Sequence, residues 1–199
     1  MTTTSSSRGF TTLSLTLIPV AVAVNYVGGA LARVLGLPLY LDSIGTVLAA
    51  ILAGPVVGAA AGAVNNVFLG LTVDATSFWY AITSVAIGVV AGLLARRGWF
   101  ASVGRAVVAG LVIALVADIV STPINVGLWE GQTGLPAGDA VYAALLRGGL
   151  PVWLASFFGE LVIDVPDKLA AALIAFGVAR ALPERLRRRF GGPVELERL

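Results

Sequence analysis

Residues 43–73 read SIGTVLAAILAGPVVGAAAGAVNNVFLGLTV, a stretch without a single charged side chain. At about 1.5 Å of rise per residue this stretch is too long for one ordinary membrane span. The pair Gly54-Pro55 divides it, because glycine commonly lies just past the end of a helix and proline fits the first turn of the next. The stretch therefore predicts two short helices, over residues 41–53 and 55–71, joined by a tight turn.

The composition of the whole chain also favours a membrane protein. Hydrophobic residues make up 58% of the 199 residues and charged residues only 12%, and the mean hydropathy is +0.94. Soluble domains carry about a quarter charged residues, so these few charges could not cover a soluble core. The chain has no cysteine and no histidine, which excludes disulfides, thiolate chemistry, imidazole metal sites and a Ser-His-Asp triad.

Four more apolar segments are long enough to be spans. They cover residues 13–31, 78–95, 106–122 and 165–182, and Pro123 closes the third of these segments. We therefore predict an all-α membrane protein with six transmembrane helices, in a membrane domain over 13–183 between an N-terminal tail (1–12) and a basic tail (184–199). The remaining stretch, 139–163, is helical in character but interrupted by glycines and a proline.

The distribution of arginine indicates the orientation of the spans. The 96–105 loop and the tail after residue 184 both carry arginine clusters, and cytoplasmic loops collect Lys and Arg. An even number of spans separates two cytoplasmic segments. Both termini are then cytoplasmic, and 139–163 lies on the outer face or re-enters the membrane.

In this topology most acidic residues fall in the outer half of the protein. Asp118 lies inside a span, where an ionisable group usually faces the bundle interior or a wet cavity. It either lines a binding site or is a structural partner of Lys168 or of a polar neighbour. Asp164 fits an N-cap of the last span, although a site role also stays open, and Lys168 either extends to the membrane surface or points into a pocket.

Aromatic residues gather at the same end of the expected bundle. Trp79 and Tyr80 open the fourth span, and Tyr40 lies close to Asp42 in the sequence. An aromatic belt at the membrane interface explains them about as well as a stacking wall for a flat ligand. Many aromatics beside several acids favour a pocket modestly.

Several catalytic classes find no support in the sequence. There is no GxxxxGK[ST] phosphate loop for ATP hydrolysis, no carboxylate pair with a histidine base and no motif of an intramembrane protease. We expect a protein that is not an enzyme, with no cofactor, no metal and no nucleic-acid partner.

Two stretches carry a resemblance to a known family. They are LPLYLDSIGT at 37–46, continuing into LAGPVVGAAAG at 52–62, and DVPDKL at 164–169, followed by LPER at 182–185. With about 200 residues and six expected spans, the chain resembles the substrate-binding S component of an energy-coupling factor (ECF) transporter. The resemblance covers about residues 13–182, and its Gly-Pro-x-x-Gly-Ala turn is moderately specific.

The resemblance implies a vitamin or micronutrient importer subunit in the plasma membrane of a bacterium or archaeon. Its partners would be the lipid bilayer, a transmembrane scaffold protein and a pair of ABC-type ATPases. The implied scaffold contact is a small-residue surface on the first span, for which Gly28 and Ala32 are the nearest candidates. The implied substrate-binding residues are Tyr40, Asp42, Trp79, Tyr80, Asp118, Asn125, Glu160, Asp164 and Lys168.

Two other classes remain open. A stand-alone ion-coupled secondary carrier would use Asp118 as its coupling site and would usually show an inverted repeat of broken helices. A membrane sensor or assembly protein without transport would use its helix faces for partner contacts alone.

Overall fold

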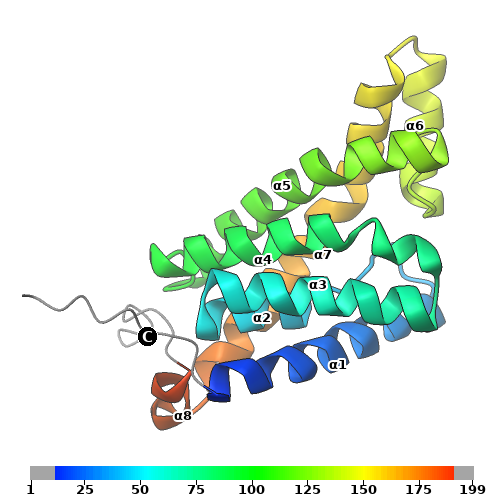
Figure 1. Ribbon diagram of the computed structural model, residues 1–199. Coiled ribbons are helices and arrows are strands. Elements are labelled where there is room, and N and C mark those ends of the chain that lie inside the picture. Colours follow the sequence, from blue (N-terminus) through cyan, green and yellow to red (C-terminus); the bar gives the residue numbers. More distant parts are fainter. Residues whose placement is uncertain (1–11, 191–199) are drawn as a thin grey trace, which may run out of the picture.

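The computed structural model describes residues 12–190, and within this range it is all-α, as the sequence predicts (Figure 1). The described part forms eight α-helices and one short 3₁₀ helix. These are α1 (Thr12–Leu35), α2 (Ile44–Ala53), α3 (Pro55–Thr72), η1 (Ala75–Phe78), α4 (Ala81–Arg96), α5 (Val103–Trp129), α6 (Pro136–Arg147), α7 (Val152–Ala181) and α8 (Glu184–Arg189). The expected N-terminal tail lies outside the described residues except for its last residue, and the basic tail begins with α8.

The helices form a bundle in which several sequence neighbours, among them α2 and α3, and α3 and α4, are also neighbours in space (Figure 1). Helices α1 to α4 pack on one another, and α5 packs along α7. Helix α6 packs on α7 at the far end of the bundle from α8. The two ends of the described chain also meet, because the Ser14 hydroxyl donates a hydrogen bond of 2.8 Å to the carbonyl of Phe190.

The turn between α2 and α3 is the one that the sequence predicts. Gly54 has φ 90°, a left-handed conformation that glycine adopts without a steric cost. Pro55 occupies the first turn of α3, where its missing N–H removes no helical hydrogen bond. Asn25 of α1 then fixes the start of α2, because its Oδ1 accepts a hydrogen bond of 2.6 Å from the N–H of Gly45.

Glycines allow α3 and α4 to pack with their backbones in close approach. A Cβ at Gly88 would lie 2.3 Å from the carbonyl carbon of Gly58, and one at Gly62 would lie 2.5 Å from the carbonyl oxygen of Ser84. Real side chains could not occupy these positions without moving one helix. The small residues of α3 therefore serve an internal helix contact, of the kind common in membrane bundles.

Two predicted helix boundaries are wrong, and both lie at prolines. Helix α5 does not stop before Pro123 but continues to Trp129. Helix α7 contains Pro166 in its interior, so Asp164 lies in mid-helix and is not an N-cap. Proline inside a helix is tolerated where neighbouring helices and local adjustments compensate for the lost backbone hydrogen bond, and both helices pack along their length on each other.

The segment 139–163 is therefore not a separate unit. It comprises most of α6, a turn at Gly148-Gly149 and the first part of α7. Gly149 has φ 88°, which lets the chain reverse before Pro151.

Three described helices are long and apolar enough to cross a membrane, over Leu13–Leu35, Pro55–Thr72 and Val103–Trp129. Helices α2 and α4 are apolar but shorter, and α7 is long but carries several charged residues. Large apolar side chains such as Val27 and Ile119 are more than half exposed on the outer faces of α1 and α5. Such surfaces suit lipid rather than water, so the chain has the helices of a multi-pass membrane protein.

Candidate functional site

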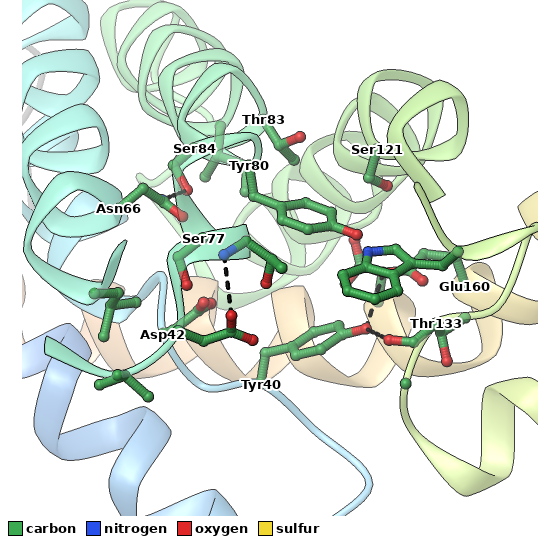
Figure 2. A pocket seen from close by; sticks show the side chains of 18 of the residues that line it. Tyr40, Asp42, Asn66, Ser77, Tyr80, Thr83, Ser84, Ser121, Thr133 and Glu160 are labelled. Carbon is green, nitrogen blue, oxygen red and sulfur yellow. Dashed lines mark hydrogen bonds between the residues drawn. The ribbon is translucent and has the colours of Figure 1, made fainter. Parts of the chain in front are cut away.

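A cavity of about 490 Å³ opens at the end of the bundle where the 36–43 loop, η1 and the 130–135 loop come together (Figure 2). Helices α3, α4, α5 and α7 form its walls. It is lined by Arg33, Tyr40, Asp42, Asn66, Leu69, Val73, Asp74, Thr76, Ser77, Tyr80, Thr83, Ser84, Ile87, Ser121, Trp129, Gln132, Thr133, Gly134, Glu160, Asp164 and Lys168. Cavities of this size commonly hold small organic ligands.

A chain of hydrogen bonds crosses one wall of the cavity. The Tyr80 hydroxyl donates to Asn125 Oδ1 at 2.6 Å, and Asn125 Nδ2 donates to Glu160 Oε2 at 3.1 Å. The Tyr40 hydroxyl lies 3.2 Å from Glu160 Oε1 and 3.3 Å from the carbonyl of Thr133 (Figure 2). Tyr40, from the loop before α2, and Asn125, from α5, thus hold Glu160 in one orientation at the cavity wall.

The two tyrosines stay protonated across the physiological range. Burial raises the pKa of Tyr40 well above its usual value, and the nearby Glu160 adds to this effect. Burial also raises the pKa of Tyr80, to about 12. Both phenols therefore remain neutral hydrogen-bond donors beside an acidic group.

The loop that carries Tyr40 is fixed to α7 by one carboxylate. Asp167 Oδ1 accepts hydrogen bonds from the N–H of Tyr40 at 3.1 Å and from that of Leu41 at 2.7 Å. The other oxygen of Asp167 lies 2.6 Å from Lys168 Nζ. Asp167 does not line the cavity itself, but these hydrogen bonds hold Tyr40 in place at the cavity wall.

Lys168 points into the bundle and not toward the membrane surface. Its side chain is 4% exposed, and its Nζ lies 3.2 Å from Asp164 Oδ1 as well as close to Asp167. The ammonium group also lies 5.6 Å from the centre of the Tyr40 ring, within the range of a cation–π contact. Asp42 faces the same group; burial raises the pKa of its carboxyl, and Lys168 opposes that shift.

Asp118 lies behind the cavity wall, fully buried between α5 and α7. Its carboxylate belongs to a cluster with Glu160 and Asp164, in which one oxygen from each residue lies within 4.8 Å of the others. The ion pairs of Lys168 among the described residues are with Asp164 and Asp167, so the structural pairing of Asp118 with Lys168 is not the arrangement found.

The structure brings together most of the residues that the sequence singled out. Six of them line the cavity: Tyr40, Asp42, Tyr80, Glu160, Asp164 and Lys168. Asn125 supports two of these residues by hydrogen bonds. Trp79 does not line the cavity and is 62% exposed, whereas the next residue, Tyr80, lines it.

Several cavity residues are not among the substrate-binding residues expected from the sequence. Trp129 and Thr133 reach the cavity because α5 extends beyond Pro123. Asn66 and Ser84 reach it from α3 and α4, and Asn66 Nδ2 donates to Ser84 Oγ at 2.5 Å (Figure 2). Isolated Ser and Thr residues in apolar segments have no periodic pattern, so only the packing of the helices shows which of them reach the cavity.

The small residues expected at a scaffold contact face the interior of the chain. Gly28 is buried, and a Cβ at this position would lie 2.1 Å from the carbonyl oxygen of Leu41. Ala32 is 1% exposed. In this conformation neither residue is accessible to a partner, and the outer face of α1 carries larger aliphatic side chains such as Val20 and Leu31.

The comparisons with known proteins give no match. No protein-family model matches the chain, no curated protein resembles it closely enough to count as a relative, and no solved structure matches its fold.

Proposed function

We propose that this chain is the membrane-embedded substrate-capture subunit of an ATP-driven importer of the ECF type, for a vitamin or a related small heterocyclic micronutrient. The observation that carries the proposal is the cavity of about 490 Å³ at one end of a bundle with apolar outer faces. Its volume lies in the range of small-molecule sites. The scaffold and the two ATPases are separate proteins in this proposal, since the sequence contains no phosphate loop.

The chemistry of the cavity supports a flat, polar ligand. Tyr40 and Tyr80 lie on opposite loops with their hydroxyls near Glu160, and Trp129 adds a third aromatic surface (Figure 2). Aromatic faces bind flat rings, and the carboxyl groups of Asp42 and Glu160 accept hydrogen bonds from amino groups. A heterocycle that carries amino groups or a positive charge fits this combination best.

The proposed topology has six crossing segments with both termini in the cytoplasm. Helices α2, α4 and α7 would complete the set begun by the three long apolar helices. The charged side chains in the middle of α7 support this view, because Glu160, Asp164 and Lys168 are each at most 4% exposed. Charged groups that are turned toward the bundle interior are compatible with a spanning helix.

The first test is the thermal stability of the purified full-length protein in detergent against a panel of vitamins, nucleobases and their precursors. A ligand that binds only the folded state stabilises it by about 2.7 kcal/mol at a hundredfold excess over the dissociation constant. A clear shift with one heterocycle would support the proposal and name the ligand. A well-folded protein that responds to no compound of a broad panel would contradict it.

A second candidate function is a stand-alone ion-coupled carrier. The observation that favours it is Asp118, a fully buried carboxylate in mid-helix, which is where coupling ions and protons bind in carriers. Reconstitution of the purified chain alone into liposomes separates the two functions. Uptake driven by an ion or proton gradient would establish the carrier, whereas uptake that requires the scaffold and the ATPases would establish the importer.

A further inference from the structure

Three carboxylates meet between α5 and α7 at the base of the cavity. Asp118 comes from α5, and Glu160 and Asp164 lie one turn apart on α7. Their exposed fractions are 0%, 4% and 3%, and one oxygen from each lies within 4.8 Å of the other two. Like charges at such distances in a buried environment repel one another strongly unless a positive charge joins them.

Asp118 has no hydrogen-bond donor for either carboxylate oxygen, and Asp164 Oδ1 has none besides its ion pair with Lys168. Buried carboxylates normally accept hydrogen bonds, and one without any is costly to the folded state. One carboxyl oxygen of Asp118 lies within 4.8 Å of oxygens of Glu160 and Asp164, and carboxylates offer each other only acceptors unless one of them holds a proton. One oxygen of Asp118 that has no hydrogen-bond donor therefore lies close to the carboxylates of Glu160 and Asp164.

Glu160, the third acid, is oriented by hydrogen bonds from residues outside the group of three acids. Tyr40 and Asn125 donate to the two oxygens of Glu160, which is the arrangement by which neighbouring groups orient a carboxylate that binds a metal. Oxygens on opposite sides of one hard divalent cation lie about 4–5 Å apart, because the ion binds each at about 2.0–2.6 Å. The spacing of the three acids suits such an ion.

The enclosure of Asp118 argues for a small ion instead of an organic ligand. Glu160 and Asp164 line the cavity, but Asp118 does not. A heterocycle in the cavity could reach the first two residues and not the third, whereas a single ion between the helices could contact all three. In the described part of the chain, Lys168 is the one basic side chain that forms ion pairs with carboxylates of α7. Its single positive charge does not balance all the carboxylates of the group.

We propose that Asp118, Glu160 and Asp164 bind one hard divalent cation, of the class of Mg²⁺, Mn²⁺ and Ca²⁺, between α5 and α7. This site goes beyond the proposed import function and does not depend on it. It also revises the expectation of no metal, since the three acids lie up to 46 positions apart in the sequence and only the packing of α5 on α7 brings them together.

The test is a direct measurement of bound metal on the purified full-length protein in detergent. After treatment with a chelator, the protein is equilibrated at neutral pH with Mg²⁺, Mn²⁺ or Ca²⁺ and freed of excess ion. Elemental mass spectrometry should find about one ion per chain for at least one of the metals, and that metal should raise the apparent Tm. Bound Mn²⁺ should also give a spin-resonance signal distinct from the hydrated ion.

Matched variants assign the ion to the three acids. Asp118→Asn should weaken metal affinity at least tenfold, as expected when a charged ligand is lost, and Glu160→Gln serves as the second variant if the first does not fold. Glu130→Gln neutralises an exposed acid just past the end of α5 and should leave the affinity unchanged. A folded wild-type protein that retains no metal, with the acids then neutralised by protons, would overturn the proposal, as would full metal binding by Asp118→Asn and Glu160→Gln.

The metal measurement and the ligand panel fail independently. Binding of the ion without binding of any organic compound would support the metal site and contradict the import function. Binding of a heterocycle that is equal with and without chelator, in a protein that holds no ion, would support the import function and contradict the metal site.

Discussion

Asp167 Oδ1 accepts a hydrogen bond of 2.7 Å from the backbone N–H of Leu41, a residue 126 positions earlier in the chain. Leu41 has φ 51°, a left-handed conformation that costs a residue with a side chain about 1–2 kcal/mol. The contact offsets this cost and places the adjacent Tyr40 at the cavity. One buried carboxylate on α7 thus determines the shape of the loop that covers the site.

The first prediction concerns the stability of this contact. Asp167→Ala should lower the free energy of unfolding by about 3–5 kcal/mol, because it leaves the buried ammonium of Lys168 without its closest partner and two N–H groups without an acceptor. Asp167→Asn keeps an acceptor oxygen and should cost less. Thermal and chemical unfolding in detergent measures both, and equal stability of wild type and Asp167→Ala would show that the loop is held by other contacts.

The second prediction concerns the close approach of α3 and α4. Gly88→Ala should destabilise the protein by about 1–3 kcal/mol, because the new Cβ would meet the backbone of Gly58 at 2.3 Å. Gly177→Ala is the matched control on α7, where a Cβ meets nothing within 4 Å. This control should be neutral or slightly stabilising, since alanine is the better helix former by about 1 kcal/mol. Two variants of equal stability would argue against the tight contact.

The third prediction separates the two tryptophans near the cavity and rests on the proposed function. With a ligand from the stability panel, Trp129→Ala should weaken binding about 5- to 150-fold, because loss of a stacking surface costs about 1–3 kcal/mol. Trp79→Ala should change the dissociation constant less than twofold, since Trp79 is exposed and does not line the cavity. Isothermal titration gives both values, and a reversed order would place the ligand outside this cavity.

The fourth prediction concerns the pH dependence of stability through Asp42. Burial raises the pKa of Asp42 in the folded protein, so between about pH 4 and that raised pKa the folded state binds more protons than the unfolded state. The contribution of this carboxyl to stability therefore falls as the pH rises through that window. Asp42→Asn lacks this term, so its stability relative to wild type should improve with rising pH.

A control of opposite sign is available at Asp74. The backbone N–H of Thr76 donates a hydrogen bond of 3.0 Å to Asp74 Oδ1 and lowers the pKa of this exposed carboxyl. The stabilising contribution of this carboxyl is present above about pH 4 and is lost as the pH falls through the lowered pKa. Asp74→Asn should therefore be less stable than wild type at neutral pH, and the difference should disappear in acid. Melting temperatures against pH check both residues, and parallel curves for wild type and Asp42→Asn would show that Asp42 does not titrate abnormally.

The fold class and one turn could be predicted from short-range features of the chain. The charge-free residues 43–73 and the pair Gly54-Pro55 define α2 and α3 to within a few residues, because a helix end depends on the backbone preferences of the residues at that point. The ends of α5 and α7 could not be predicted in this way. Pro123 and Pro166 usually end helices, and the packing of α5 on α7 overrides that local preference.

Six of the residues expected at the site line the cavity, but the sequence does not predict how they are arranged. Tyr40, Glu160 and Lys168 stand out in the sequence because polar and aromatic groups are unusual in apolar segments. Their hydrogen bonds cannot be predicted in this way, because neither the bond from Asn125 to Glu160 nor the bond from the N–H of Leu41 to Asp167 follows from any spacing along the chain.

The sequence by itself determined that this protein is helical, apolar on the outside and acidic at one end, since composition and local backbone preferences are properties of neighbouring residues. Only the tertiary structure decided which acids meet, that Lys168 is buried and that Trp79 does not line the cavity. The orientation of a side chain depends on which helix packs against it. A contact between Asp118 and Asp164 exists only because α5 and α7 lie side by side over that length.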